Sequence, residues 1–146
     1  MLKIIPVGTD VRKLALDGYP AQNIVACDLR QEFIDAGHKL FQDTDGSCKI
    51  NFFATDIFDV TPASASAEAE VIPPLSDLKE VKSLNKLKGR ITHLYAGSLF
   101  HIWNVETQYA VALRFASLAG PAPGTIIFGR HQGSETAGII GSEMGM

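Results

Sequence analysis

Short apolar runs and longer helical stripes alternate along the chain. Five apolar runs predict β-strands, at residues 1–8, 23–28, 49–54, 91–96 and 125–129. Between them, apolar residues spaced three and four apart predict helices at 10–17, 30–43, 76–87 and 104–119. This order of elements predicts an α/β fold with a mostly parallel sheet and helices on both of its faces.

Two of these helices carry more specific expectations. Ser76 is expected to cap the helix that ends near Leu87, and Asn104 the helix that ends near Ala119. The apolar face of the last helix is expected to consist of Tyr109, Ala112, Leu113 and Ala116.

Residues 61–75 differ in composition from the rest of the chain. Ser, Ala and Glu dominate there, and Pro62, Pro73 and Pro74 discourage a regular element at both ends. We expect a mobile surface loop at about 61–75 rather than a domain boundary. A length of 146 residues suits one domain better than two, so residues 1–146 are expected to form a single domain.

Composition and charge narrow the class of protein. The hydrophobic fraction of 46%, the charged fraction of 20% and the net charge of -3 are typical of an ordinary globular protein, and they do not suggest binding to nucleic acid or to an acidic membrane surface. No apolar stretch approaches the roughly 20 residues that span a bilayer, and Pro6 and Gly8 interrupt the first apolar run, which argues against a signal peptide. Two cysteines, Cys27 and Cys48, are too few for a disulfide framework, so a reducing, cytoplasmic location is expected.

Carboxylates follow two of the predicted strands. Asp28 ends the run at 23–28, and Asp56 follows the run at 49–54. Ligands of parallel sheets bind beyond the carboxyl ends of the strands, where one carboxylate can accept hydrogen bonds from both hydroxyls of a ribose. We therefore expect Asp28 and Asp56 to face a shared crevice for a nucleoside. The alternative for Asp28 is an ordinary exposed aspartate at a strand end.

Four segments lie in order near the predicted strand ends. They are Val7-Gly8-Thr9-Asp10-Val11-Arg12-Lys13-Leu14, Asp28-Leu29-Arg30-Gln31-Glu32-Phe33, Asp56-Ile57-Phe58 and Ser98-Leu99-Phe100-His101. Together they resemble class I S-adenosylmethionine-dependent methyltransferases, in particular the fungal group that tailors polyketides and meroterpenoids. The likeness extends from Val7 to about Gly133.

The resemblance implies a Rossmann-like methyltransferase fold with S-adenosylmethionine as its cofactor. By position, it assigns Gly8 and Asp10 to the methionine portion, Asp28 with Leu29 to the ribose, Asp56 and Ile57 to the adenine ring, and Gly97 and Ser98 to the methyl group. A nicotinamide dinucleotide would also need the acid at Asp28, but no G-x-G-x-x-G precedes it.

Two parts of the family pattern are expected to be missing, which makes the methyltransferase fold incomplete. The family has a longer glycine-rich turn before the position of Gly8, and a further helix and an antiparallel hairpin after the strand at 125–129. An unfinished sheet exposes an apolar edge, so we expect a homodimer.

Four residues are candidates for the substrate side of the same edge. His101 follows the strand at 91–96 and could act as a general base, and Trp103 could line an apolar pocket. Arg130 and His131 could bind an acidic substrate group. The alternatives are a packed histidine beneath Trp103, a core or interface aromatic, and an ordinary surface turn. The spacing of the histidines and cysteines does not suggest a metal site.

Three functional hypotheses remain. The first is methyl transfer to a hydroxyl or carboxyl group of a small, apolar, polycyclic fungal secondary metabolite. The second is a methyltransferase-derived scaffold that no longer methylates and instead catalyses an isomerisation or cyclisation with His101. The third is a non-catalytic remnant that dimerises.

Overall fold

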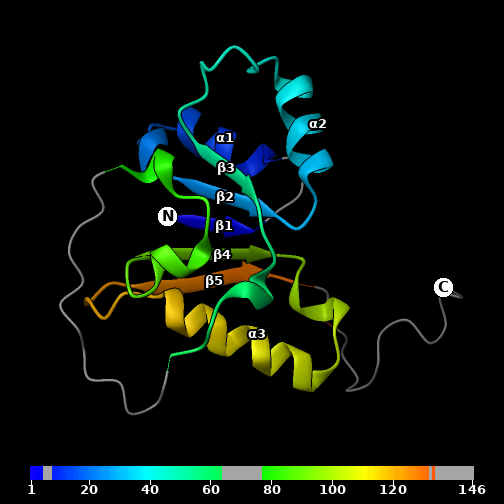
Figure 1. Cartoon of the computed structure of the whole chain (residues 1–146), viewed down its shortest axis with the longest axis vertical. Helices are drawn as coiled ribbons and strands as arrows, with labels where there is room; N and C mark the ends of the chain where they lie inside the picture. The colour runs from blue at the N-terminus through cyan, green and yellow to red at the C-terminus, as the bar shows by residue number, and fades with distance from the viewer. Residues whose placement is uncertain (5–7, 64–76, 132, 134–146) are drawn as a thin grey trace, which may run out of the picture.

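The described part of the chain contains one parallel sheet. The computed structural model describes residues 1–4, 8–63, 77–131 and 133. Within these residues, five strands pair in the order β3-β2-β1-β4-β5 (Figure 1). They are β1 (Leu2–Ile4), β2 (Val25–Asp28), β3 (Asn51–Ala54), β4 (His93–Gly97) and β5 (Ile126–Arg130). All five predicted strands are confirmed with somewhat different bounds, whereas Ser76 and most of the loop predicted at about 61–75 lie outside the described residues.

The carboxyl ends of the strands share one edge of the sheet. Asp28 at the end of β2 is in register with Ala54 at the end of β3. Gly97 at the end of β4 is in register with Arg130 at the end of β5. Figure 1 shows the strands stacked from β3 to β5 with their arrowheads pointing the same way. Residues that follow the strands therefore meet at this edge.

Helices cover both faces of the sheet. The α-helices of the described residues are α1 (Thr9–Leu16), α2 (Gln31–Phe41) and α3 (Val105–Leu118). In β2, Val25 and Cys27 enter the core cluster that contains the buried side of α3, whereas Ala26 enters a second cluster with Val11 of α1. The predicted α/β layering is confirmed. None of the described helices is long and apolar enough to cross a membrane.

The continuous helix predicted at 76–87 is wrong. Two 3-10 helices, η3 (Leu78–Glu80) and η4 (Leu84–Leu87), occupy this stretch, and Val81 between them is extended. The side chains of Asp77 and Ser83 accept hydrogen bonds from N–H groups two residues further on. Such local bonds compete with the hydrogen bonds of an α-helix.

A buried amide in β3 completes the explanation. Asn51 donates hydrogen bonds to the carbonyl oxygens of Leu78 and Val81, at 2.7 and 2.8 Å. In a continuous α-helix, these carbonyls would accept from N–H groups four residues later. The spacing of the apolar residues nevertheless indicates buried positions correctly, because the side chains of Val81, Leu84 and Leu87 lie in the core.

The chain on both sides of residues 64–76 is tied to the rest of the molecule. The side-chain oxygen of Asn85 accepts from the N–H of Thr61 at 3.1 Å, and its NH₂ group donates to the carbonyl of Asp59 at 2.7 Å. The N–H of Ala63 donates to the hydroxyl of Ser117 on α3 at 2.7 Å.

Helix α3 begins after Asn104, as predicted, but it buries a different face. Tyr109 is 66% exposed and Leu113 is 41% exposed. The buried side chains of α3 are instead Val111, Phe115 and Leu118. The predicted face contains two alanines, whereas the buried one presents three larger apolar side chains and so removes more apolar area from water.

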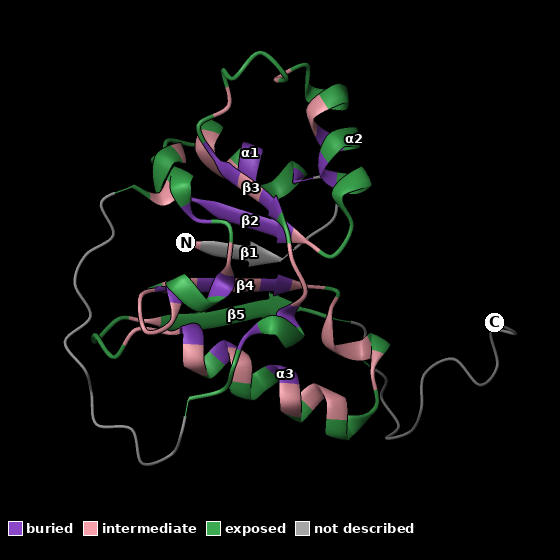
Figure 2. Ribbon diagram, viewed as in Figure 1, coloured by how far each residue is buried: buried purple, intermediate pink, exposed green. Residues whose placement is uncertain are grey.

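The last strand leaves apolar side chains exposed. Within the described residues, β5 is an edge strand that pairs only with β4, and all five of its residues are exposed (Figure 2). They include Ile126, Ile127 and Phe128. The ring of Phe128 meets that of Tyr95 edge-on, with centroids 5.2 Å apart.

Candidate functional site

The two predicted carboxylates lie on one rim of the sheet. Asp28 ends β2, and Asp56 lies two residues beyond the end of β3. The strand ends are joined, because the N–H of Thr55 donates to the carbonyl of Asp28 at 2.9 Å. Gly8 and Asp10 lie at the start of α1, which follows β1 beside β2.

Each carboxylate uses one oxygen to hold a local turn. An oxygen of Asp28 accepts from the N–H of Arg30 at 2.9 Å, and an oxygen of Asp56 accepts from the N–H of Phe58 at 2.9 Å. These bonds fix the direction of both side chains. Within the described residues, the second oxygen of each carboxylate is left for a ligand that donates hydrogen bonds.

The apolar neighbours of the two aspartates have different surroundings. Leu29 is 67% exposed and can contact a ligand at this rim. Ile57 is buried in the core cluster beneath α3. Leu29 is therefore accessible to a ligand at the rim, whereas the side chain of Ile57 anchors its turn to the core.

The end of β4 has little room for side chains. A Cβ atom at Gly97 would lie 2.9 Å from the ring of Tyr95. Ser98 has a φ of 55°, in the left-handed region that non-glycine residues rarely adopt, and its N–H donates to the carbonyl of Arg130 at 2.6 Å. The backbone at Gly97 and Ser98 is thus held tightly against its neighbours, in a conformation that is often associated with functional sites.

His101 and His131 lie near each other at this edge. His101 belongs to the 3-10 helix η5 (Phe100–Ile102), and its ring is nearly parallel to that of His131, with centroids 6.4 Å apart. The Nδ1 atom of His101 is buried without a hydrogen-bond partner among the described residues. His131 and the adjacent Arg130 are exposed.

Trp103 contributes to packing. Its ring meets that of Phe58 edge-on, with centroids 5.9 Å apart, and it packs against the core cluster beneath α3. It is only half-buried, so the part of the ring that remains accessible can still contact an apolar substrate.

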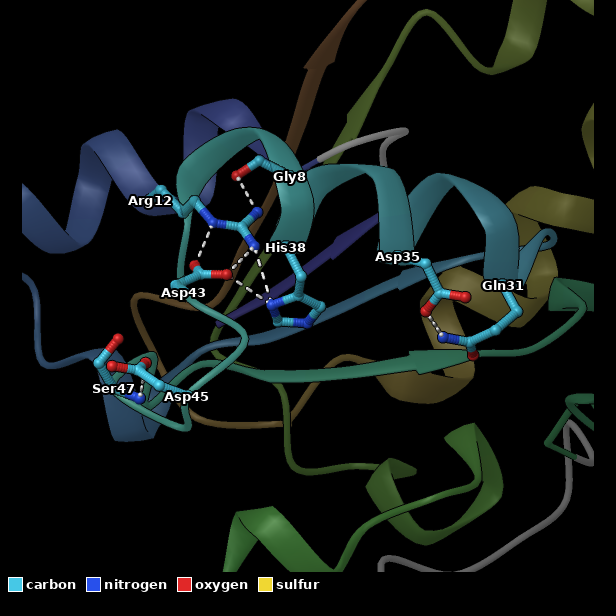
Figure 3. Close-up of polar contacts among 8 residues, drawn as sticks. All are labelled: Gly8, Arg12, Gln31, Asp35, His38, Asp43, Asp45 and Ser47. Atoms are coloured by element: carbon cyan, nitrogen blue, oxygen red, sulfur yellow. Dashed lines mark hydrogen bonds and ion pairs between the residues drawn. The ribbon is translucent and has the colours of Figure 1, made fainter.

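A buried polar cluster was not anticipated from the sequence. Arg12 of α1 is only 8% exposed, and it forms a forked ion pair with Asp43 through Nε at 2.7 Å and Nη2 at 3.2 Å (Figure 3). His38 of α2 places its Nδ1 atom 2.6 Å from the same carboxylate. The hydrogen bond from Arg12 is the main reason why the pKa of Asp43 falls to about 2.

The signal for this cluster in the sequence is weak. Arg12 adjoins the buried Val11 in an amphipathic helix, but its partners are 26 and 31 residues away. Neither distance follows a short-range pattern, so the pairing depends on how α1 packs against the end of α2.

A pocket of about 380 Å³ lies beside this cluster. It is lined by Asp35, His38, Asp43, Thr44, Gly46 and Cys48. Burial raises the pKa of the Cys48 thiol. Cys48 precedes β3, so the pocket is near the amino end of that strand and away from the rim with Asp56. Within the described residues, no group of three metal-ligating side chains is close enough to hold a metal ion.

Comparison with known proteins finds similarity to methyltransferases. No protein-family model matches the chain. It is 34% identical over 132 residues to O-methyltransferase phiE of Fungal sp. (strain ATCC 74256) and 35% identical over 125 residues to O-methyltransferase atr3 of Stereocaulon alpinum. It is 30% identical over 120 residues to methyltransferase adrK of Penicillium roqueforti.

These matches cover most of this chain but a minor part of each relative. They include 90%, 86% and 82% of the chain, and 37%, 30% and 36% of phiE, atr3 and adrK. The chain thus spans about a third of the length of these relatives. The resemblance predicted from the four segments is confirmed, and the chain is a partial-length homologue of fungal secondary-metabolite O-methyltransferases.

Proposed function

We propose that the chain forms the nucleoside-binding part of an S-adenosylmethionine-dependent methyltransferase that tailors a fungal secondary metabolite. The observation that carries the proposal is the pair Asp28, which ends β2, and Asp56, which lies two residues beyond the end of the adjacent parallel strand β3. The strand order and the helices on both faces support a Rossmann-like methyltransferase fold in one domain. The partial-length homology supports the type of reaction.

The residues present fit this cofactor at several points. The accessible oxygen of Asp28 can accept from the ribose hydroxyls, and the exposed Leu29 can pack on the adjoining rings. Asp56 with Ile57 would border the adenine ring, and Gly8 with Asp10 the methionine portion. Gly97 and Ser98 would approach the methyl group with their backbone. When bound, the cofactor supplies an electrophilic methyl group.

The substrate side of the proposed site uses the residues beyond β4 and β5. His101, whose ring is partly accessible at this edge, would take the proton of a substrate hydroxyl. Trp103 would contact an apolar polycyclic substrate, and the exposed Arg130 and His131 would bind an acidic group on it. In-line transfer then depends mainly on positioning.

Calorimetric titration with S-adenosylhomocysteine tests the proposal. The wild-type chain is expected to bind, and Asp28→Asn is expected to weaken binding by at least about 10-fold through loss of charge-assisted hydrogen bonds. Asp35→Asn is the matched control, because Asp35 is exposed on α2 and bonds to Gln31. Absence of binding by the wild-type chain at millimolar ligand would refute the proposal.

A second candidate function uses the same site at the strand ends but does not transfer a methyl group. The neighbouring rings of His101 and His131 favour proton transfer without a cofactor, as in an isomerisation or cyclisation. This candidate requires product formation from a pathway intermediate without added cofactor, and loss of that product in His101→Ala. Product formation that depends strictly on S-adenosylmethionine would rule it out.

The exposed β5 edge supports a homodimer, which would also suit a non-catalytic role. Sedimentation equilibrium tests this, with Phe128→Asp expected to shift the chain to a monomer. A wild-type chain that sediments as a monomer would refute the dimer.

A further inference from the structure

The Arg12 cluster joins the start of α1 to the end of α2. Besides its ion pair with Asp43, Arg12 points its Nη1 atom at the carbonyl of Gly8, at a distance of 3.4 Å (Figure 3). The backbone N–H of Arg12 donates to the same carbonyl at 3.3 Å. Gly8 is therefore held twice by a residue whose own side chain is anchored on Asp43, two residues beyond the end of α2.

We infer that Arg12 is a positioning residue that sets the backbone of Gly8 for binding of the nucleoside cofactor. The inference rests on the proposed function, because it concerns the same rim. Gly8 precedes α1 and follows β1, the strand beside the one that carries Asp28. A displacement of Gly8 would therefore change the wall next to the proposed ribose site.

The surroundings of Gly8 show how little its position can vary. Its φ of 71° is in the left-handed region, and a Cβ atom there would lie 2.6 Å from the ring of Phe52 and 2.7 Å from Nη1 of Arg12. The backbone thus packs directly on these two side chains. A change in either one moves the surface against which Gly8 rests.

Arg12 is itself held in one orientation. Its guanidinium carbon lies 4.8 Å from the centroid of the Phe41 ring and 4.6 Å from that of Phe52. The forked bonds to Asp43 fix the plane of the group between these rings. A buried ion pair adds little stability compared with well-packed apolar side chains. The planar guanidinium of an arginine, however, fixes the direction of its hydrogen bonds, which the ammonium group of a lysine does not.

His38 fixes the orientation of Asp43. A nitrogen 2.6 Å from an ionised carboxylate must have a hydrogen between them, so Nδ1 of His38 donates to Asp43. The approach of Nη2 of Arg12 to the same nitrogen, at 3.3 Å, is then a contact between two donors rather than a hydrogen bond. Asp43 therefore receives hydrogen bonds from both helices, which couples the end of α2 to the start of α1.

Binding of S-adenosylhomocysteine to Arg12→Lys and Asp43→Asn tests the inference. Arg12→Lys keeps the charge but loses the fork. At a temperature where every variant is fully folded, it is expected to weaken binding on the order of 10-fold, since small misplacements of a site are costly. The amide signal of Gly8 should shift in both variants. Loss of stability alone would not change the dissociation constant under these conditions.

Lys13→Met is the matched control, because Lys13 is on the same helix and forms an exposed ion pair with Asp17. It should leave both the affinity and the Gly8 signal unchanged. If the wild-type chain binds and both cluster variants bind equally well, the positioning role is refuted while the proposed function stands. If the wild-type chain does not bind, the proposed function fails, and the positioning role fails with it. If one variant does not fold, the other gives the result.

Discussion

The substitution Asp43→Asn should make the free energy of unfolding less dependent on pH. In the native protein the pKa of Asp43 is about 2, against an ordinary value of 3.8. The side chain is only 13% exposed, so solvent screens the interaction little. At roughly 1.4 kcal/mol for each pKa unit, the ionised carboxylate contributes about 2 kcal/mol near neutral pH.

The sign follows from the unfolded chain, which takes up the proton before the native one does as the pH falls. The contribution is complete above about pH 5, and about 1 kcal/mol of it is lost by pH 3. Urea denaturation at several pH values measures this as the difference in unfolding free energy between the wild type and Asp43→Asn. That difference should shrink between pH 5 and pH 3.

Asp17→Asn is the control for this experiment. Asp17 and its partner Lys13 have side chains that are 56% and 67% exposed, and such pairs contribute less than about 1 kcal/mol. The control should show no comparable change with pH. A difference between the wild type and Asp43→Asn that stays constant from pH 5 to pH 3 would refute the reasoning.

Three further experiments test the fold. Gly129→Ala should lower the melting temperature strongly, because its Cβ atom would lie 2.0 Å from the carbonyl oxygen of Ala96, whereas Gly133→Ala, with open space around it, should not. Asn104→Ala removes the side-chain cap of α3 and should cost about 1 kcal/mol of unfolding free energy in urea. Burial raises the pKa of the Cys27 thiol to about 12, so mass spectrometry should find it unmodified by iodoacetamide at pH 8 until the protein unfolds.

The elements that could be predicted from the sequence are those whose cause is local. The strand ending in Asp28 is an apolar run that stops at a carboxylate, and α2 has its apolar residues at helical spacing. The side-chain cap at Asn104 lies three residues before the N–H group that it holds. In each case the residues that decide the structure are neighbours in the chain, so pattern and spacing were sufficient.

The predictions that are wrong concern structure decided by residues far apart in the sequence. The helix expected at 76–87 is broken by the amide of Asn51, which is 27 and 30 residues from the carbonyls it binds. The buried face of α3 is decided by its packing against η2 (Ile57–Asp59) and η4. The spacing of apolar residues within α3 gives no information about this packing. For the site, strand ends could be placed on one rim from topology alone, whereas the support of Gly8 by Arg12 required the packing of two helices.

The described segments on either side of residues 64–76 are anchored by separate groups, which has a consequence for mutagenesis. Asn85 and Ser117 hold the segment that ends at Ala63, and Asn51 holds the segment that starts with η3. Removing one anchor leaves the others in place. A substitution of Asn51 therefore frees the carbonyls of Leu78 and Val81 while Ala63 stays bonded to Ser117, so the two segments can be loosened one at a time.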